Sequence, residues 1–293
     1  MSWEAKSFQV EIPEIYQLEL TNACNLKCSM CIREDERVKR PIGFMDIELV
    51  KRMVDRGDFE GSYFVELQMY GEVLLNPELG EFIELLHTVG IKVGLSTNGT
   101  MVKERLNELC TLDYLTISVD TTDKKEYEEQ RGYKFDDLVN NINLIYNCNK
   151  RPKIDLQVIN FWDGKDNLPG LIETFKGYDV TCRSVPDCFA AYQDRNYPSE
   201  QRYNLCLNPW LSVSVHWDGD VVPCCFSAGK HIVYGNLYRD SLKDIWNNSN
   251  ERLKLTDDMR RNYNIDREPC LYCYMRSPVL FHQRMLMQNI RGG

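Results

Sequence analysis

Hydrophobic and polar residues follow two different periods along the first two thirds of the chain. Short apolar runs rich in β-branched and aromatic residues indicate buried strands, and the stretches between them have the i, i+3, i+4 spacing of amphipathic helices. The predicted strands cover residues 16–20, 63–70, 92–98, 114–120, 153–160 and 180–185. The predicted helices cover residues 46–57, 77–90, 103–110 and 135–148.

Regular alternation of strands and helices predicts a parallel sheet covered by helices. Six such units would form an α/β fold of the partial (βα)6 TIM-barrel type, which we expect over residues 1–186. In barrels of this kind the active-site groups collect where strands end and loops begin. The polar or glycine-containing segments TNAC, YGE, STNG and SVD all lie at the ends of predicted strands. The sequence therefore predicts a functional site at that end of the sheet.

The periodic pattern of apolar and polar residues ends after the last predicted strand. Residues 187–205 are polar with scattered aromatic residues and no clear period, which indicates a linker, and residues 206–293 read as a smaller α+β module. The stretch LSVSVHWDGDVVPCC alternates on both sides of an Asp-Gly pair, which predicts a β-hairpin. Residues 241–255, SLKDIWNNSNERLKL, read as one helix.

Composition and charge exclude several classes of protein. The chain has 293 residues, of which 43% are hydrophobic, and a net charge of −9. This acidity argues against a nucleic-acid backbone or an anionic membrane as the main partner. No run approaches the roughly 18 apolar residues of a membrane span, and the N-terminus carries acids where a secretion signal has a basic and then an apolar run. We therefore expect a cytoplasmic protein.

The 12 cysteines fall into isolated and clustered positions. Because a reducing cytosol disfavours structural disulfides, clustered thiols there indicate metal ligands or catalytic groups. Cys110, Cys148, Cys182 and Cys188 each stand alone in the sequence and are expected to be small core or loop residues. The four histidines share no metal-ligand spacing and are expected to be structural.

Three cysteines lie together directly after the first predicted strand. They are Cys24, Cys28 and Cys31, in the segment TNACNLKCSMCIRE, and no fourth cysteine is near. A structural zinc ion or an ordinary iron–sulfur cluster takes four protein ligands. Two interpretations are open, a zinc loop with a distant fourth ligand or a cluster with one metal corner left free.

This Cys-x-x-x-Cys-x-x-Cys segment, after the first strand of a βα barrel, resembles that of the radical SAM superfamily. The resemblance implies that the three thiolates hold three irons of a [4Fe–4S] cluster and that the fourth iron binds S-adenosylmethionine. It further implies that one electron cleaves this molecule to methionine and a 5′-deoxyadenosyl radical, which abstracts hydrogen from a substrate carbon. The physiological electron donor would then be of the flavodoxin or ferredoxin type.

Other segments match the same family and nominate contacts to S-adenosylmethionine. Met30 stands where the family has an apolar or aromatic residue beside the adenine. The segment YGEVLLNPEL resembles the Gly-Gly-Glu-Pro segment, so Gly71 and Glu72 are expected to bind the methionine ammonium group. In this chain Tyr70 and Val73 replace the first glycine and the proline of that segment.

The next two strands end in STNG and SVD, where family members contact the ribose and the methionine carboxylate. Asn98 and Ser118 are the first candidates, with Thr97 and Asp120 behind them. Asn-Gly also forms turns without any ligand. Arg131, in DKKEYEEQRG, resembles an arginine that approaches the carboxylate of S-adenosylmethionine, and a solvated charge at a helix end is the alternative.

The C-terminal segments CLNPWLSVSVHWDGDVVPCC, YGNLYRDSLKDIW and CLYC resemble the SPASM domain and its shortened "twitch" form, which hold auxiliary [4Fe–4S] clusters. The resemblance implies one auxiliary cluster, hence two clusters in the chain. Its ligands would be Cys206, Cys224, Cys270 and Cys273. Cys225 is left over, either as a small buried residue or as a catalytic hydrogen-atom donor to a substrate radical.

Three classes of function follow from these resemblances. The first is a radical SAM oxidase of a small polar substrate such as an amino sugar or aminocyclitol, with the auxiliary cluster as electron acceptor. The second is a redox-neutral epimerase using Cys225, or a maturase of ribosomal peptides. The third is a non-enzymatic metal-binding protein. The absence of an obvious N-terminal peptide-binding domain favours a small substrate, and the oxidase is our first expectation.

Overall fold

The computed structural model describes residues 10–160, 166–186, 206–261, 267–270 and 273. Within this part of the chain one sheet has nine strands, in the order β6-β5-β4-β3-β2-β1-β7-β8-β9. The strands are β1 (Glu14–Leu18), β2 (Phe64–Glu66), β3 (Lys92–Thr97), β4 (Tyr114–Ser118), β5 (Lys153–Asn160), β6 (Thr181–Pro186), β7 (Ser212–Val215), β8 (Asp220–Val222) and β9 (Gly235–Asn236).

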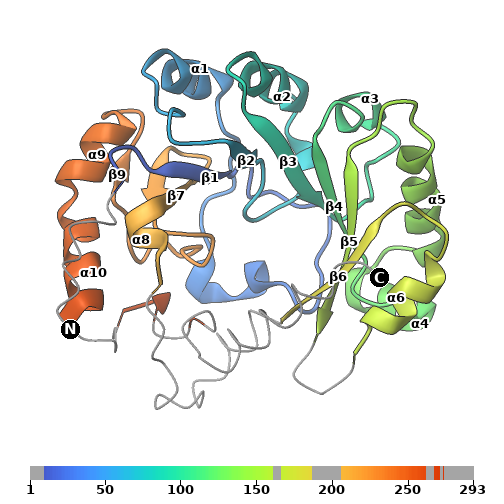
Figure 1. The fold of residues 1–293 in the computed structure, drawn as a ribbon. Helices are drawn as coiled ribbons and strands as arrows, with labels where there is room; N and C mark the ends of the chain where they lie inside the picture. The colour runs from blue at the N-terminus through green and yellow to red at the C-terminus, as the bar shows by residue number, and fades with distance from the viewer. Residues whose placement is uncertain (1–9, 161–165, 187–205, 262–266, 271–272, 274–293) are drawn as a thin grey trace, which may run out of the picture.

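The first six strands pair in parallel and in sequence order. They form an open arc, and helices α1, α2, α3 and α5 lie on its convex side (Figure 1). This arrangement confirms the predicted partial barrel. The helices of this part are α1 (Ile47–Asp55), α2 (Leu79–Thr88), α3 (Leu106–Leu109), α4 (Lys124–Arg131), α5 (Phe135–Tyr146) and α6 (Leu168–Thr174).

The helices begin and end where the sequence provides caps. The side chain of Asp46 accepts a hydrogen bond from the N–H of Glu48 and starts α1, and Asp123 does the same for α4 through Glu126. Helix α4 ends at Gly132, whose φ of 68° lies in the left-handed region that favours glycine.

The hydrophobic core lies between the sheet and the helices on its convex side. Alternate strand residues supply it, and Ile15, Val65, Val93, Leu115 and Leu156 are all fully buried in it. Because successive strand residues point to opposite faces, the residues between them face the concave side of the arc.

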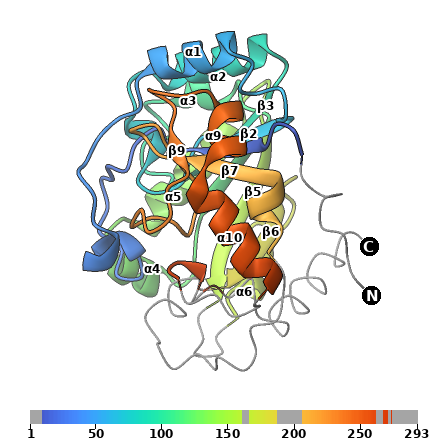
Figure 2. The same cartoon turned by 90° about the vertical axis from the view of Figure 1, so that its left-hand side faces the viewer.

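The C-terminal hairpin is confirmed, with Gly219 in the turn at a φ of 81° between β7 and β8. It does not stand apart from the barrel, because β7 pairs in parallel with β1 and thereby extends the same sheet. Helices α8 (Asn208–Leu211), α9 (Leu242–Asn248) and α10 (Asn250–Arg261) lie at this end of the arc, as Figure 2 shows.

The single helix predicted over residues 241–255 is wrong, because the chain forms α9 and α10 with a break between them. Ser249 at the break has an extended backbone, with a φ of −66° and a ψ of 113°. Its hydroxyl accepts a hydrogen bond of 3.3 Å from the N–H of Arg252. A serine that bonds to the backbone in this way ends one helix and starts another.

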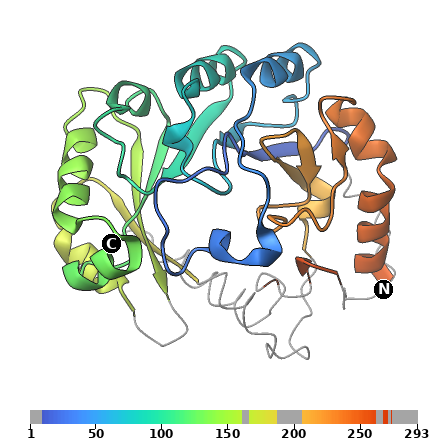
Figure 3. The same ribbon diagram turned by 180° about the vertical axis from the view of Figure 1, so that it is seen from behind.

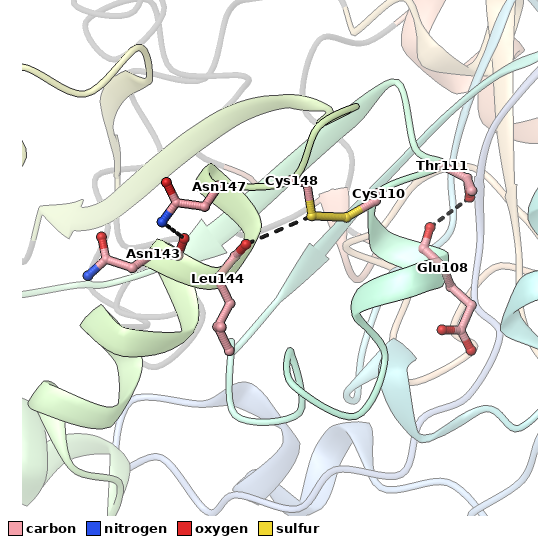
Figure 4. Close-up of a disulfide and its surroundings, with 7 residues drawn as sticks. All are labelled: Glu108, Cys110, Thr111, Asn143, Leu144, Asn147 and Cys148. Atoms are coloured by element: carbon pink, nitrogen blue, oxygen red, sulfur yellow. Dashed lines mark hydrogen bonds between the residues drawn. A yellow bond between two sulfur atoms is a disulfide. The ribbon is translucent and has the colours of Figure 1, made fainter.

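The prediction that Cys110 and Cys148 stand alone is also wrong, since the structure joins them in a disulfide (Figure 4). Cys110 follows α3 and Cys148 lies shortly after α5, and their Cα atoms are 6.5 Å apart. They are 38 residues apart in sequence, and only the packing of these two helices on the sheet brings them together. Cys182 is half-buried in β6, whereas Cys188 lies outside the described residues.

The predicted linker, residues 187–205, lies outside the described residues, as do residues 274–293. Among the helices that are described, none combines the length and the apolar character that crossing a lipid bilayer requires.

Candidate active site

The loop that leaves β1 crosses the open, concave side of the arc (Figure 3), and it contains the three clustered cysteines. The loop is held by backbone hydrogen bonds of 3.0 Å from Cys31 to the carbonyl of Cys28 and of 3.0 Å from Ser29 to the carbonyl of Gln130 in α4. The sulfur of Cys24 accepts a hydrogen bond of 3.4 Å from the N–H of Leu26. Local turns and α4 therefore position the three thiols.

The three thiols lie close enough for the charge of one to affect the pKa of another. Burial raises the pKa of Cys28 to about 11; Arg131 opposes the shift, and the charges of Cys31 and Cys24 add to it. Within the described ranges, no three His, Cys, Asp or Glu side chains come close enough together to hold a single metal ion. Three thiols whose charges affect one another fit a cluster in which each thiolate binds its own iron.

Gly71 lies directly against this loop. Its φ is 90°, and a Cβ atom there would lie 2.5 Å from the carbonyl oxygen of Ala23 and 2.6 Å from that of Thr21. The next residue, Glu72, donates its backbone N–H to Ala23 at 2.7 Å. Only glycine lets the segment after β2 approach the cysteine loop this closely.

The Glu72 carboxylate is buried and bonded to the protein. It accepts hydrogen bonds from the hydroxyl of Thr97 at 2.7 Å and from the backbone N–H groups of Asn98 at 2.8 Å and Leu74 at 3.1 Å. Asn98 in turn directs its side-chain amide to the sulfur of Cys24 at 3.8 Å. Three predicted site residues thus form one network that reaches a cluster cysteine.

Asp120 and Arg131 form a buried ion pair. Asp120 has a φ of 61° at the end of β4, and the Nε of Arg131 donates to its carboxylate at 2.7 Å. Burial lowers the pKa of Arg131, but the charges of Asp120 and Cys28 raise it, and the net shift is upward. The alternative of a solvated charge is wrong, since Arg131 is only 8% exposed.

Two further residues, Ser118 and Met30, were predicted to contact S-adenosylmethionine. Ser118 is half-buried at the end of β4, and Met30 is half-buried directly before Cys31. Both remain predictions.

We expect Gly71→Ala to destabilise the protein by about 2–4 kcal/mol, because the methyl group adds a backbone clash to left-handed strain. Urea unfolding of the full chain measures this. Gly90→Ala is the matched control, since Gly90 has a φ of 78° with nothing within 4 Å of its Cβ position. The loss of stability in Gly90→Ala therefore measures the left-handed backbone strain alone, about 1 kcal/mol. Equal losses in the two variants would contradict the close approach described here.

A second group of thiols lies in the C-terminal module. Burial raises the pKa of Cys224 well above its usual range, and the charges of Cys225, Cys273, Cys206 and Cys270 add to this. The buried hydroxyl of Tyr234 lies beside them and has no hydrogen-bond partner among the described residues. Clustered thiols with an unpaired buried donor fit an iron–sulfur cluster, which would supply sulfur acceptors.

Tyr70 joins the two groups, and the sequence alone did not identify this role. Its hydroxyl donates a hydrogen bond to the backbone carbonyl of Cys225. Burial raises the pKa of Tyr70 well above its usual range, and the charges of Cys225 and Cys224 add to this. The one signal in the sequence was that Tyr70 replaces a glycine of the family pattern.

The concave face of the sheet is polar across several strands. Glu66 accepts hydrogen bonds from Ser96 at 2.9 Å and from Gln17 at 3.4 Å, and Gln17 accepts one from Ser214 at 3.1 Å. On the far side, Arg183 donates to Thr116 at 3.0 Å. TIM barrels usually fill this space with apolar side chains. Here it offers donors and acceptors instead.

Two family models match the chain. The model of the radical SAM superfamily matches residues 18–161. The model of the SPASM iron–sulfur cluster-binding domain matches residues 206–274. The first contains the Cys24 loop and the network around Glu72, and the second contains the hairpin and the C-terminal thiols.

Curated relatives agree with these matches. An uncharacterized protein of Methanocaldococcus jannaschii is 31% identical over 147 residues, 48% of this chain and 47% of that protein. The chain thus spans about half the length of this relative. The tungsten-containing aldehyde ferredoxin oxidoreductase cofactor-modifying protein of Pyrococcus furiosus is 24% identical over 90% of this chain and 88% of its own length.

Solved structures share the fold. BtrN, in complex with AdoMet and 2-DOIA, has a TM-score of 0.56 at 18% identity, covering 90% of this chain and 93% of BtrN. SuiB of Streptococcus suis, bound to S-adenosylmethionine, has a TM-score of 0.67 at 15% identity, covering 93% of this chain and 73% of SuiB. The chain therefore belongs to the radical SAM superfamily, carries a C-terminal SPASM module, and uses [4Fe–4S] clusters with S-adenosylmethionine.

Proposed function

We propose that this protein is a radical SAM oxidase that dehydrogenates a small polar substrate, such as an amino sugar or aminocyclitol. The observation that carries this proposal is the polar concave face of the sheet. Glu66 supplies a carboxylate there, and Ser96, Gln17 and Ser214 supply hydroxyl and amide groups. A substrate rich in hydroxyl and amino groups needs such partners when it leaves water.

The position of this polar layer supports a substrate site. Glu66 and Ser96 lie near the ends of β2 and β3, shortly before the segments that contain Glu72 and Asn98. Burial raises the pKa of Glu66, while the bond from Ser96 and the charge of Arg183 oppose the shift. A carboxylate in this setting gains from a cationic or hydroxyl-bearing partner. A substrate bound there would lie one layer below the cysteine loop.

We assign the cluster ligands as the sequence predicted them. Cys24, Cys28 and Cys31 would hold the first cluster, which when bound supplies the electron that cleaves S-adenosylmethionine to methionine and the 5′-deoxyadenosyl radical. Gly71, Asn98, Ser118 and Arg131 would line the place of that molecule, with Met30 beside its adenine. Glu72, Thr97 and Asp120 would act by fixing these neighbours, because their polar atoms bond to them.

The auxiliary cluster that the C-terminal thiols would hold is the acceptor of the electron that leaves the substrate radical. We assign Cys206, Cys224, Cys270 and Cys273 to the auxiliary cluster, and a flavodoxin- or ferredoxin-type protein as the donor to the first. In this oxidation the substrate loses one hydrogen atom to the 5′-deoxyadenosyl radical, one electron to the auxiliary cluster and one proton. The fold of BtrN, whose complex contains 2-DOIA, supports a small substrate. SuiB, bound to the precursor peptide SuiA, supports the peptide alternative.

Cys225→Ala tests the oxidase against the epimerase. We expect this variant to keep most of the wild-type turnover, because an oxidase needs the auxiliary cluster and not a spare thiol. The substitution is mild, since Tyr70 bonds to the backbone carbonyl of residue 225, which alanine retains. The measurement is 5′-deoxyadenosine and product formed from a panel of aminocyclitols, in ordinary and heavy water.

An epimerase would give a different result. It needs a hydrogen atom from the thiol, so its product would carry solvent deuterium at the reacting carbon, and Cys225→Ala would form 5′-deoxyadenosine without inverted product. That outcome would overturn the oxidase. Turnover with peptides and none with aminocyclitols would instead support a maturase.

A further inference from the structure

The C-terminal module contains a buried hydroxyl that its fold leaves without a partner. Tyr234 is 6% exposed, and its hydroxyl bonds to no group in the described part of the chain. A buried polar group left unpaired destabilises the fold, because it has lost its hydrogen bonds to water. Natural structures rarely keep such a group unless a ligand, an ion or a water molecule satisfies it.

The backbone places this tyrosine beside the cysteines assigned to the auxiliary cluster. The N–H of Tyr234 donates to the carbonyl of Val221 at 2.7 Å, and β8 leads from Val221 through Pro223 into Cys224. Burial raises the pKa of Tyr234 well above its usual range, and the charges of Cys224, Cys270 and Cys206 add to this. Three of the four assigned ligands therefore lie around one unpaired hydroxyl.

A buried cation, Arg252, lies near the Tyr234 hydroxyl and affects its pKa. Arg252 of α10 is 1% exposed and stacks on Trp246, with its guanidinium carbon 3.8 Å from the ring centroid. Its Nε donates to the carbonyl of Trp246 at 2.7 Å, and its Nη1 to that of Pro209 at 3.4 Å. Its Nη2 has no partner among the described residues. Pro209 lies three positions after Cys206, so the guanidinium is bonded to the segment that follows one of these three ligands.

We propose that the Tyr234 hydroxyl, with the Arg252 guanidinium beside it, donates a hydrogen bond to sulfur of the auxiliary cluster and raises its reduction potential. Hydrogen bonds to sulfur and nearby positive charge favour the more negative, reduced form of a cluster. The proposal rests on the ligand set proposed above. It gives the module a reason to accept the electron that leaves a substrate radical.

The test is a potentiometric titration of the full chain with both clusters, followed by electron paramagnetic resonance. The auxiliary cluster is recognised because addition of S-adenosylmethionine changes only the signal of the other one. In Tyr234→Phe the ratio of reduced to oxidised auxiliary cluster at a fixed potential should fall about tenfold. For a one-electron couple this is a midpoint about 59 mV more negative.

Tyr127→Phe is the matched control. Tyr127 is also buried, and its hydroxyl has no partner among the residues that the structure describes, but its charged neighbours are Arg131, Asp120 and Cys28, at the first cluster site. This variant should leave the midpoint of the auxiliary cluster unchanged. Equal auxiliary midpoints in Tyr234→Phe and Tyr127→Phe would overturn the proposal.

A second replacement at the same position decides the matter even if Tyr234→Phe fails to retain iron. Incorporating 3,5-difluorotyrosine at position 234 keeps the ring and the hydroxyl and makes the hydroxyl a stronger donor. The midpoint should then move to a higher potential. An unchanged or lower midpoint in this protein would overturn the proposal. None of these readings requires substrate turnover, so they stand apart from the test of the oxidase.

Discussion

Replacing Cys24, Cys28 and Cys31 together with alanine should abolish reductive cleavage of S-adenosylmethionine. The three thiolates are the assigned ligands of the first cluster, and no other described cysteine lies in their loop. Cys206 comes shortly before α8 and Cys224 shortly after β8, outside the first cysteine loop, so the auxiliary cluster should remain. We expect about four iron atoms per chain instead of about eight. Formation of 5′-deoxyadenosine and iron content are the measurements.

The complementary variant is the control for this experiment. Replacing Cys270 and Cys273 with alanine should remove the auxiliary cluster and leave the cleavage of S-adenosylmethionine in place. Cleavage that survives the triple replacement would show that the active site lies elsewhere. Loss of all iron in the triple variant would show that the two sites do not form independently.

Arg131→Met should destabilise the protein by about 3–5 kcal/mol and sharply reduce the cleavage of S-adenosylmethionine. Methionine fills similar space but leaves the Asp120 carboxylate, which is fully buried, without its partner. Breaking a buried ion pair from one side costs this much because an uncompensated charge remains. Arg131 also neighbours Cys28, so the cysteine loop loses its nearby positive charge. Denaturant unfolding and 5′-deoxyadenosine formation measure the two effects.

Arg261→Met is the matched control for Arg131→Met. Arg261 bonds to Asp257 at 2.9 Å, a distance like that in the buried pair, but the two side chains are 76% and 48% exposed. An exposed pair contributes about 0.5 kcal/mol or less. A loss in Arg131→Met as small as that in Arg261→Met would contradict the burial of the first pair.

The cysteine loop after β1 could be located from the sequence because the pattern that identifies it is local. Cys24, Cys28 and Cys31 lie in one loop, and their spacing carries the signal by itself. The partners of Glu72 could not be predicted in this way. Its bonds to Thr97 and Asn98 span 25 and 26 residues, and they depend on how two neighbouring strands end. Strand order follows from alternation, but the direction of each loop does not.

Burial decided between alternatives that the sequence had left open. Arg131 ends a highly charged helix, so a solvated position and a ligand contact were both plausible from the residues alone. The structure buries it, because α4 turns this residue toward Asp120. Cys110 and Cys148 show the same limit, since their pairing depends on how α3 and α5 pack.

The predicted strands agree with the structure where alternation continues and fail where the chain bends. Residues 92–98 were predicted and β3 covers Lys92–Thr97. In contrast, residues 63–70 are more apolar than residues 92–98, yet β2 covers only Phe64–Glu66. The chain turns after β2 to bring Gly71 against the cysteine loop. This packing contact ends the strand early, and the hydrophobic pattern of the sequence does not predict it.

The pairing of β7 with β1 has a consequence for electron transfer. The first cysteine loop leaves the end of β1, and the segment with Cys224 leaves β8, which pairs with β7. The separation of the two redox centres is therefore set by the register of these strands. The hydrogen bond from the Tyr70 hydroxyl to the backbone carbonyl of Cys225 is a second connection between the two parts. A tunnelling distance set by a rigid sheet does not vary with domain motion. In the oxidase proposed above, electron transfer from the substrate to the auxiliary cluster would then need no docking step within the chain.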